Sequence, residues 1–412
     1  MLIKSILINI VVAIVSTQEL RYDNYALYKV HPRNERDIEY LNKVEKENQG
    51  LDFWKTVRRV GDYASVVAPP ELRHKFEHLM SKRSIRSDLM LTNIQDALEA
   101  QTYSRRKRDN NMLWTVYQTI EDIYAWFYDL ASQHSFVSLI QLGTTYEGRN
   151  ITGIKISRGS SGQNIILEGG QIGADWLSPT VLTYIVNQLI EGEDPDAIIA
   201  ARDFDWHIFP ILNPDGHKFS DDSVRLWTKN RRPTVGTNLG VDLTKNWNSQ
   251  WGIIGASFDP ASNNYAGNGP FTEIETRSLS RYIESLYPSV VAYLSFRGFG
   301  QRFLIPFAHS TAPMYNYVDM LTLGRRAMGA LAGRYGTQYL VGTSAQVHDG
   351  NTGNVADWVK YRFNVTMVAT YHLRDTGGFG YILPVNQILP SCEETFDSLM
   401  SLLREARHMN VI

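Results

Sequence analysis

The stretch "NIILEGGQIGADWLSPTVLTYIVNQLI", residues 164–190, decides the fold class. Its apolar start ends at Glu168, two glycines mark a turn, and apolar residues then recur at helical spacing. A strand, a turn and a helix in this order are typical of α/β proteins, in which ligands lie at the carboxyl ends of strands. Chemistry is therefore expected at this turn. After Glu168, however, its only charged residue is Asp175.

The chain downstream of residue 108 continues this alternation. Apolar runs that fit buried strands lie at 206–212, 290–296 and 365–373. Helical patterns lie at 178–192, 272–287, 316–336 and 392–409, and an aromatic and aliphatic helix stripe runs from 114 to 130. Near-continuous apolar strands separated by helices predict an α/β fold with a mixed, largely parallel sheet covered on both faces.

Composition limits the classes of partner. The chain has 412 residues, a net charge of −2 and 20% charged residues, so it is an ordinary globular chain of two or more domains. Such a balanced charge gives no field that would attract nucleic acid. After the N-terminus, no apolar run reaches the roughly 18 residues of a membrane-spanning helix. We expect a monomer without nucleic-acid or membrane partners.

The N-terminal part divides into two segments. Residues 1–17, "MLIKSILINIVVAIVST", carry one lysine before an apolar run, which predicts a secretory signal peptide rather than a buried helix. Residues 18–108 are highly charged and helix-rich, and they end in the tetrabasic run Arg105–Arg108. In a secreted chain this run predicts a processing site that leaves 109–412 as the mature unit. The alternative is a solvated linker.

Three smaller sequence features also carry predictions: the cysteine, two glycosylation sequons and one zinc-type pattern. Cys392 is the only cysteine, so it predicts a buried small hydrophobic side chain, or alternatively a bridge between molecules. Glycosylation sequons begin at Asn150 and Asn364, and each is usable only if it is exposed. The segment from His74 to His78 fits the zinc pattern H-x-x-E-H. It lies upstream of the processing site on an amphipathic helix, so we expect a solvated helix face there.

Long phrases in the chain carry a family resemblance. They include "VAPPELRHKFEHLM", "GTTYEGRNITGIKIS", "ILNPDGHKFS", "GVDLTKNW", "YAGNGPFTEIET" and "HLRDTGGFGYILPVNQILPSCEETF". The chain resembles the secreted zinc carboxypeptidases of the pancreatic and insect digestive type, together with their activation propeptide. The resemblance implies a small α+β propeptide domain, followed by a carboxypeptidase domain with a mixed, mostly parallel eight-stranded sheet and helices on both faces. It also implies secretion as a zymogen and proteolysis with zinc as cofactor.

The same resemblance assigns the site positions one by one. The three zinc-ligand positions are occupied by Ile172, Asp175 and Arg297. The general-base position holds His372, and the oxyanion-arginine position holds Thr228. The remaining positions contact substrate in the family, and here they hold Ala174, Arg225, Thr244, Lys245, Asp349 and Ala356. The position of Asp349 depends on a loop that could carry a gap.

These replacements predict a carboxypeptidase-like pseudoenzyme that holds no zinc. Isoleucine cannot bind a metal, and Arg297 would place a permanent cation where zinc would lie. We expect Arg297 to form a salt bridge with Asp175, since an unpaired buried charge is costly. An unusual site of Asp175, His372 and a loop residue is the remaining metal hypothesis.

Three functional readings stay open. The first is a protein that binds peptide or protein C-termini, or that regulates an active relative. The second is a working metallocarboxypeptidase, as the resemblance alone implies. The third is a structural or storage protein. The chain's own propeptide is a further partner, and the sequence does not decide whether it stays attached after processing.

Overall fold

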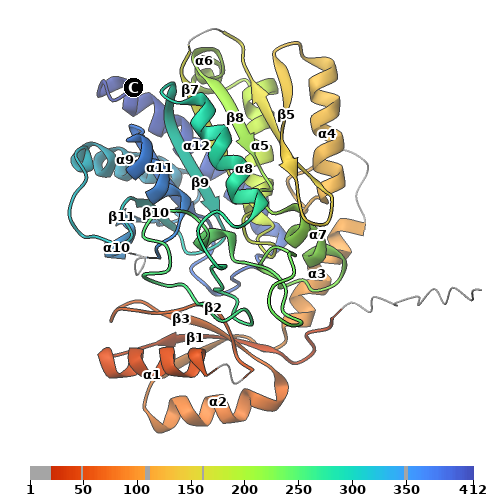
Figure 1. The fold of residues 1–412 in the computed structure, drawn as a ribbon, viewed down its shortest axis with the longest axis vertical. Helices are drawn as coiled ribbons and strands as arrows, with labels where there is room; N and C mark the ends of the chain where they lie inside the picture. Colours follow the sequence, from red (N-terminus) through yellow and green to blue (C-terminus); the bar gives the residue numbers. More distant parts are fainter. Residues whose placement is uncertain (1–19, 48–49, 107–111, 160–161, 348–350) are drawn as a thin grey trace, which may run out of the picture.

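The computed structural model describes residues 20–47, 50–106, 112–159, 162–347 and 351–412, which form two domains (Figure 1). The expected signal peptide at 1–17 and the cleavage point after residue 108 lie outside these ranges. Within the described ranges, no helix has both the length and the apolar character needed to cross a bilayer.

The N-terminal domain is a four-stranded antiparallel sheet with two helices on one face. The strand order is β2-β3-β1-β4. The strands are β1 (Ala26–His31), β2 (Asp52–Lys55), β3 (Ala64–Ala68) and β4 (Arg86–Leu91). The two helices on that face are α1 (Glu35–Lys46) and α2 (Pro70–Lys82), and α3 (Ile94–Arg106) follows β4. Neighbouring residues of β3 face opposite ways, as a strand requires: Val66 packs with α1 and α2, whereas Val67 joins a cluster with Leu226 and Ile382 of the C-terminal domain.

The C-terminal domain is built on an eight-stranded mixed sheet of order β11-β10-β12-β9-β7-β8-β6-β5. Its strands are β5 (Val137–Thr144), β6 (Asn150–Ile156), β7 (Asn164–Glu168), β8 (Asp205–Phe209), β9 (Val290–Arg297), β10 (Arg302–Ile305), β11 (Leu340–Thr343) and β12 (Met367–His372). The central strands β8, β7, β9 and β12 run parallel. The pairs β5–β6, β6–β8 and β10–β12 are antiparallel. The predicted mixed, mostly parallel sheet is confirmed.

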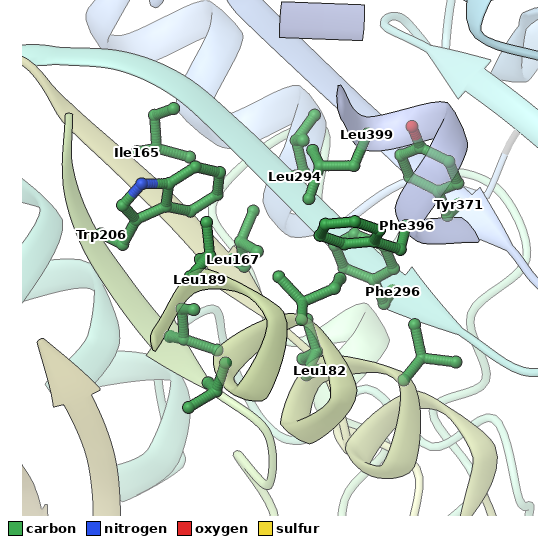
Figure 2. Packing of buried hydrophobic residues seen from close by; sticks show 14 of the residues in the cluster. Ile165, Leu167, Leu182, Leu189, Trp206, Leu294, Phe296, Tyr371, Phe396 and Leu399 are labelled. Carbon is green, nitrogen blue, oxygen red and sulfur yellow. The ribbon is translucent and has the colours of Figure 1, made fainter. Parts of the chain in front are cut away.

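Helices cover both faces of this sheet. They are α4 (Ile120–Gln133), α5 (Leu177–Glu191), α6 (Pro195–Asp203), α7 (Pro214–Asp222), α8 (Ile274–Leu286), α9 (Tyr317–Tyr335), α10 (Ser344–Val347), α11 (Val355–Phe363) and α12 (Ile388–His408). The larger core lies between the sheet and α4, α5, α9 and α12. Figure 2 shows part of it, with Leu182 of α5, Phe296 of β9 and Phe396 of α12 close together. The second core lies under α8 and α11.

Two expected boundaries are wrong, each for a local reason. The helix stripe expected from 114 begins only at Ile120, because Thr119 and Asp122 form a capping box that fixes the first turn there. The strand expected over 206–212 ends at Phe209. Pro210 follows it and has no N–H to donate to the sheet.

The N-terminal domain lies against the C-terminal domain at the end of the sheet where β7, β9 and β12 terminate (Figure 1). A buried ion cluster joins the two domains. The Asp62 carboxylate lies 2.8 Å from Lys55 Nζ and 2.8 Å from Arg302 Nη2 at the start of β10. Burial would raise the pKa of Asp62, but the two cations outweigh it and hold the pKa at about 2.

Removing this carboxylate is expected to destabilise the full chain strongly. Asp62→Asn leaves Lys55 and Arg302 buried without their shared counter-charge, and breaking a buried pair costs about 3–5 kcal/mol. Asp88→Asn is the matched control, because Asp88 pairs with Arg86 on the surface of the same domain, where such pairs contribute about 0–1 kcal/mol. Urea unfolding of both variants measures the difference. Equal losses of stability in the two variants would contradict a special role for the buried cluster.

The stability that Asp62 contributes should also depend on pH. Because its pKa is lowered in the folded chain, its contribution to the free energy of unfolding should be constant above about pH 4 and decline as the pH falls towards 2.

Candidate functional site

The turn after β7 is held by Asp175. Gly170 has φ +60°, and a Cβ there would lie 2.6 Å from the Pro210 carbonyl oxygen, so the turn needs glycine. The Asp175 carboxylate is 2% exposed. It accepts hydrogen bonds from Ser178 N at 3.1 Å, Ser178 Oγ at 2.7 Å and Gly298 N at 2.8 Å. Both oxygens are therefore used to cap the start of α5 and to tie it to the end of β9.

The expected salt bridge between Asp175 and Arg297 is wrong. Their charged groups are not within ion-pair distance, because Asp175 faces the amides of Ser178 and Gly298. The carboxylate that Arg297 influences is Glu168, the last residue of β7. Ser295 pairs with Glu168 across the two strands, and Arg297 lies two residues further on, on the same face of β9. Burial raises the pKa of Glu168, and the Arg297 cation partly offsets that shift.

A cavity of about 110 Å³ lies above this turn, between the two domains. The C-terminal domain contributes the residues at five of the expected site positions, which are Ile172, Thr244, Lys245, Arg297 and His372. The N-terminal domain contributes four consecutive residues, 53–56, at the end of β2. The structure thus brings these expected positions together, and it adds a wall that the sequence did not reveal.

Lys245 supplies a buried cation to the cavity. It ends a single 3₁₀ turn, Leu243–Lys245, in which Asp242 accepts from Thr244 N at 2.9 Å and from Thr244 Oγ1 at 2.7 Å. The Thr244 hydroxyl is thus engaged by Asp242, and both residues line the cavity. Burial lowers the pKa of Lys245 to about 8; Asp242 opposes this shift and Arg297 adds to it. Asp242 also lines the cavity and its charge acts on Lys245, but among the described residues neither Lys245 nor Arg297 forms an ion pair with a carboxylate.

His372 closes the cavity from β12, where it pairs in register with Arg297. Its Nδ1 donates to the Phe299 carbonyl at 3.1 Å. Burial lowers the pKa of His372 to about 3, and Arg297 and Arg302 add to the shift. The imidazole is therefore neutral at physiological pH and adds no charge to the site.

A second cavity of about 20 Å³ adjoins the first through Arg297 and His372. Ala356, which the resemblance assigned to substrate contact, is one of the residues that line this second cavity. The neighbouring Asp357 carboxylate accepts from Ala308 N at 2.9 Å and is 1% exposed, so it is engaged by the backbone. This space is sufficient for about one water-sized group.

Comparison with known proteins explains the arrangement. Residues 123–398 match the family model described as zinc carboxypeptidase, and residues 28–101 match the one described as carboxypeptidase activation peptide. The chain belongs to the zinc carboxypeptidase family. The N-terminal domain is accordingly its propeptide.

Several relatives of this carboxypeptidase-family chain span most of its length. Zinc carboxypeptidase A 1 of Anopheles gambiae is 34% identical over 402 residues, which cover 96% of this chain and 93% of the relative. Carboxypeptidase B of Astacus astacus is 34% identical over 294 residues, which cover 70% of this chain and 96% of the relative. Thrombin activatable fibrinolysis inhibitor has the same fold, with a TM-score of 0.85 at 21% identity over 92% of this chain and 98% of that one. Carboxypeptidase A from Helicoverpa armigera also has a TM-score of 0.85, at 21% sequence identity, and the match covers 95% of this chain and 99% of that one.

The residues that the family resemblance assigns to the zinc positions do not fit a zinc ion. Ile172 has no donor atom, and both Asp175 oxygens already accept hydrogen bonds within the turn. Arg297 is a permanent cation that faces the same cavity. In the described part of the chain, no group of three His, Cys, Asp or Glu side chains could hold a metal.

One expected substrate contact, Arg225, and the residue at the expected oxyanion position, Thr228, lie away from the two cavities. Arg225 was expected to line the cleft. It is instead a structural residue beneath the turn, because its guanidinium donates to the carbonyls of Ala174 at 2.9 Å and Tyr381 at 3.0 Å and stacks 3.5 Å from the Trp176 ring. Thr228 accepts from Gly173 N at 2.9 Å through its carbonyl and does not line either cavity. Asp349 lies outside the described residues.

The smaller sequence signals are located too. His74 is on the exposed face of α2, 3.7 Å from Glu77, which itself accepts from the Tyr28 hydroxyl. The expected solvated helix face is therefore present. Cys392 is fully buried in α12, as expected for a small hydrophobic side chain. The sequon residues Asn150 and Asn364 are both exposed.

Some cavity residues could not be predicted from the sequence. Trp54 and Lys55 come from the propeptide, far away in the chain, and Tyr381 lies in a glycine-rich loop. The Trp54 and Tyr381 rings meet at 5.6 Å across the domain boundary. The stretch "GGFGYIL" belongs to a phrase that carries the family resemblance, but no local pattern shows which of its side chains will face a cleft.

Proposed function

We propose that this chain is a secreted carboxypeptidase-family protein that binds peptide C-termini in its cleft without hydrolysing them. The observation that carries the proposal is the pair of cations, Lys245 and Arg297, which line one cavity and, among the described residues, form no ion pair with a carboxylate. A carboxylate is the ligand that best complements them.

The physical argument starts from the cost of buried charge. An ammonium group removed from water without a counter-ion is unfavourable, and the lowered pKa of Lys245 reflects that cost. A bound carboxylate would supply the missing counter-charge and form charge-assisted hydrogen bonds with Lys245 and Arg297. Lys245 also occupies the position where the family resemblance places the substrate carboxylate.

Loss of hydrolysis is proposed from the same positions. The ligand set does not fit zinc, and the neutral His372 replaces the expected carboxylate base. Thr228 brings no positive charge to the position of the oxyanion arginine. The competing function, an active metallocarboxypeptidase, is favoured by family membership and by the 34% identity to a zinc carboxypeptidase. Family membership does not determine activity, because activity depends on the site.

The propeptide sets the conditions for binding. Residues 53–56 form one wall of the cavity, so a peptide would enter only after the propeptide moves away. We therefore expect binding by the chain cleaved after Arg108. Secretion is part of the proposal because of the leader-like segment 1–17 and the activation-peptide domain. A role as decoy or regulator of an active relative would follow.

Peptides that differ only at the C-terminus test this function. Fluorescent peptides with a free carboxylate are expected to bind the cleaved chain at least about tenfold more tightly than their C-terminal amides, because a charged hydrogen bond contributes about 1.5–3 kcal/mol. Mass spectrometry of the recovered peptides should show no shortening. Equal binding of acid and amide would refute the proposal, and chelator-sensitive shortening would establish the active alternative.

A further inference from the structure

The sequon at Asn364 lies in an exposed aromatic surface that the cleft does not use. We propose that Asn364 carries an N-linked glycan that covers this surface. The Asn364 patch consists of four large side chains with exposed fractions of 52, 68, 71 and 74%, which are Tyr287, Tyr315, Val318 and Tyr361. The proposal rests on secretion, which is itself part of the proposed function.

The backbone presents Asn364 outwards. It caps the C-terminus of α11 in the left-handed conformation, with φ 52° and ψ 34°, and its N–H bonds to the Lys360 carbonyl at 3.0 Å. Asparagine tolerates this conformation, so the cap alone accounts for the residue type. The cap does not require the hydroxyl of Thr366, which completes the sequon. Within the described residues, no hydrogen bond engages the side-chain amide of Asn364 or the hydroxyl of Thr366, whose carbonyl alone accepts one from Asn316.

Contacts place the patch around the sequon. On one side, the Tyr287 ring lies 5.2 Å from the ring of Phe363, the residue before Asn364. On another side, Asn316 Nδ2 donates to the Thr366 carbonyl at 2.8 Å, which brings the start of α9 next to the sequon. Tyr315, the residue before Asn316, lies with its ring 4.4 Å from Lys360 Nζ.

An exposed aromatic group of this kind needs an occupant. Large exposed apolar patches on soluble proteins usually mark a surface that something covers. Aromatic faces pack well against groups that combine apolar and polar sides, and sugar rings have both C–H faces and hydroxyl groups. The sequon at the centre of the patch supplies such an occupant from the chain itself.

The glycan would leave the proposed binding cleft open. Ala356 and Asp357, near the N-terminus of α11, line the smaller cavity. Asn364 follows the C-terminus of that nine-residue helix, which is about 13 Å long. The attachment point is therefore at the end of α11 away from the cavities.

Site occupancy is the first test. The full chain with its own N-terminus is expressed in insect cells, recovered from the medium and deglycosylated by a peptide N-glycosidase in ¹⁸O-water. We expect near-complete conversion of Asn364 to ¹⁸O-labelled aspartate. Thr366→Val should abolish the label, whereas Thr366→Ser keeps the sequon and should retain it. Secreted chain with an unmodified Asn364 would overturn the glycan proposal alone; unmodified chain retained in the cytosol would overturn secretion as well.

Coverage of the patch is the second test. Removing the glycan from folded protein should increase the fluorescence of a dye that binds apolar surface. In the double variant Tyr315→Ser, Tyr361→Ser, the same treatment should give a much smaller increase, because the two most exposed rings are gone. Dye fluorescence that does not change on deglycosylation of the unaltered chain would refute coverage.

Discussion

The zinc content of protein purified from zinc-supplemented medium is expected to be far below one ion per chain. In the triple variant Ile172→His, Asp175→Glu, Arg297→His, the zinc content is expected to rise to about one ion per chain, because the variant supplies three ligands and removes the cation. Elemental mass spectrometry after dialysis against metal-free buffer measures both. The effect is large because zinc binding needs a complete ligand set, so it should be close to all or none.

A single substitution separates this expectation from the unusual metal site. His372 is the last residue of β12, whereas Asp175 lies in the turn before α5 and is already bonded to Ser178 and Gly298. His372→Ala should therefore leave the low zinc content of the natural chain unchanged. A natural chain that holds one zinc ion, and loses it on His372→Ala, would contradict our reading of the site and establish a rearranged metal centre.

The fold could be predicted in its centre and less well at its edges. The strands β8, β9 and β12 are apolar runs buried on both faces, and such runs are conspicuous in a sequence. In the edge strand β5 only Val137 and Ile140 are buried, and β10 and β11 have four residues each. Short or half-exposed strands resemble loops, because the neighbours that define them are distant in the chain.

The site was predicted by position better than by contact. The family resemblance located Ile172, Lys245 and Arg297 at one cavity, and the structure places them there. The expected pairing of Arg297 with Asp175 failed because a carboxylate three residues before Ser178 caps the helix start locally. The prediction that Arg225 lines the cleft was wrong for a similar reason, since its guanidinium donates to backbone carbonyls instead. Sequence identifies the charges at a site, whereas their partners depend on the folded backbone.

Lys245→Met is expected to weaken binding of a free-carboxylate peptide about 10- to 100-fold, on the scale of one charge-assisted hydrogen bond. Binding of the C-terminal amide should not change, because an amide has no charge for Lys245 to neutralise. Fluorescence anisotropy with the chain cleaved after Arg108 measures both affinities. Lys360→Met is the matched control. Burial also lowers the pKa of Lys360 to about 8, but its Nζ donates to the Val365 carbonyl at 2.8 Å and lines neither cavity.

The pH dependence of binding gives the sharper test of the same lysine. Lys245 must be protonated to attract a carboxylate, and its pKa is about 8, so affinity should be flat from pH 6 to 7 and fall as the pH rises through about 8. The neutral His372, with a pKa of about 3, should add no step near pH 6. Arg297 keeps its charge throughout. Lys245→Met should therefore bind more weakly but without the fall above pH 8. If that fall persists in the variant, another group controls the site, and Lys245 is not the carboxylate anchor.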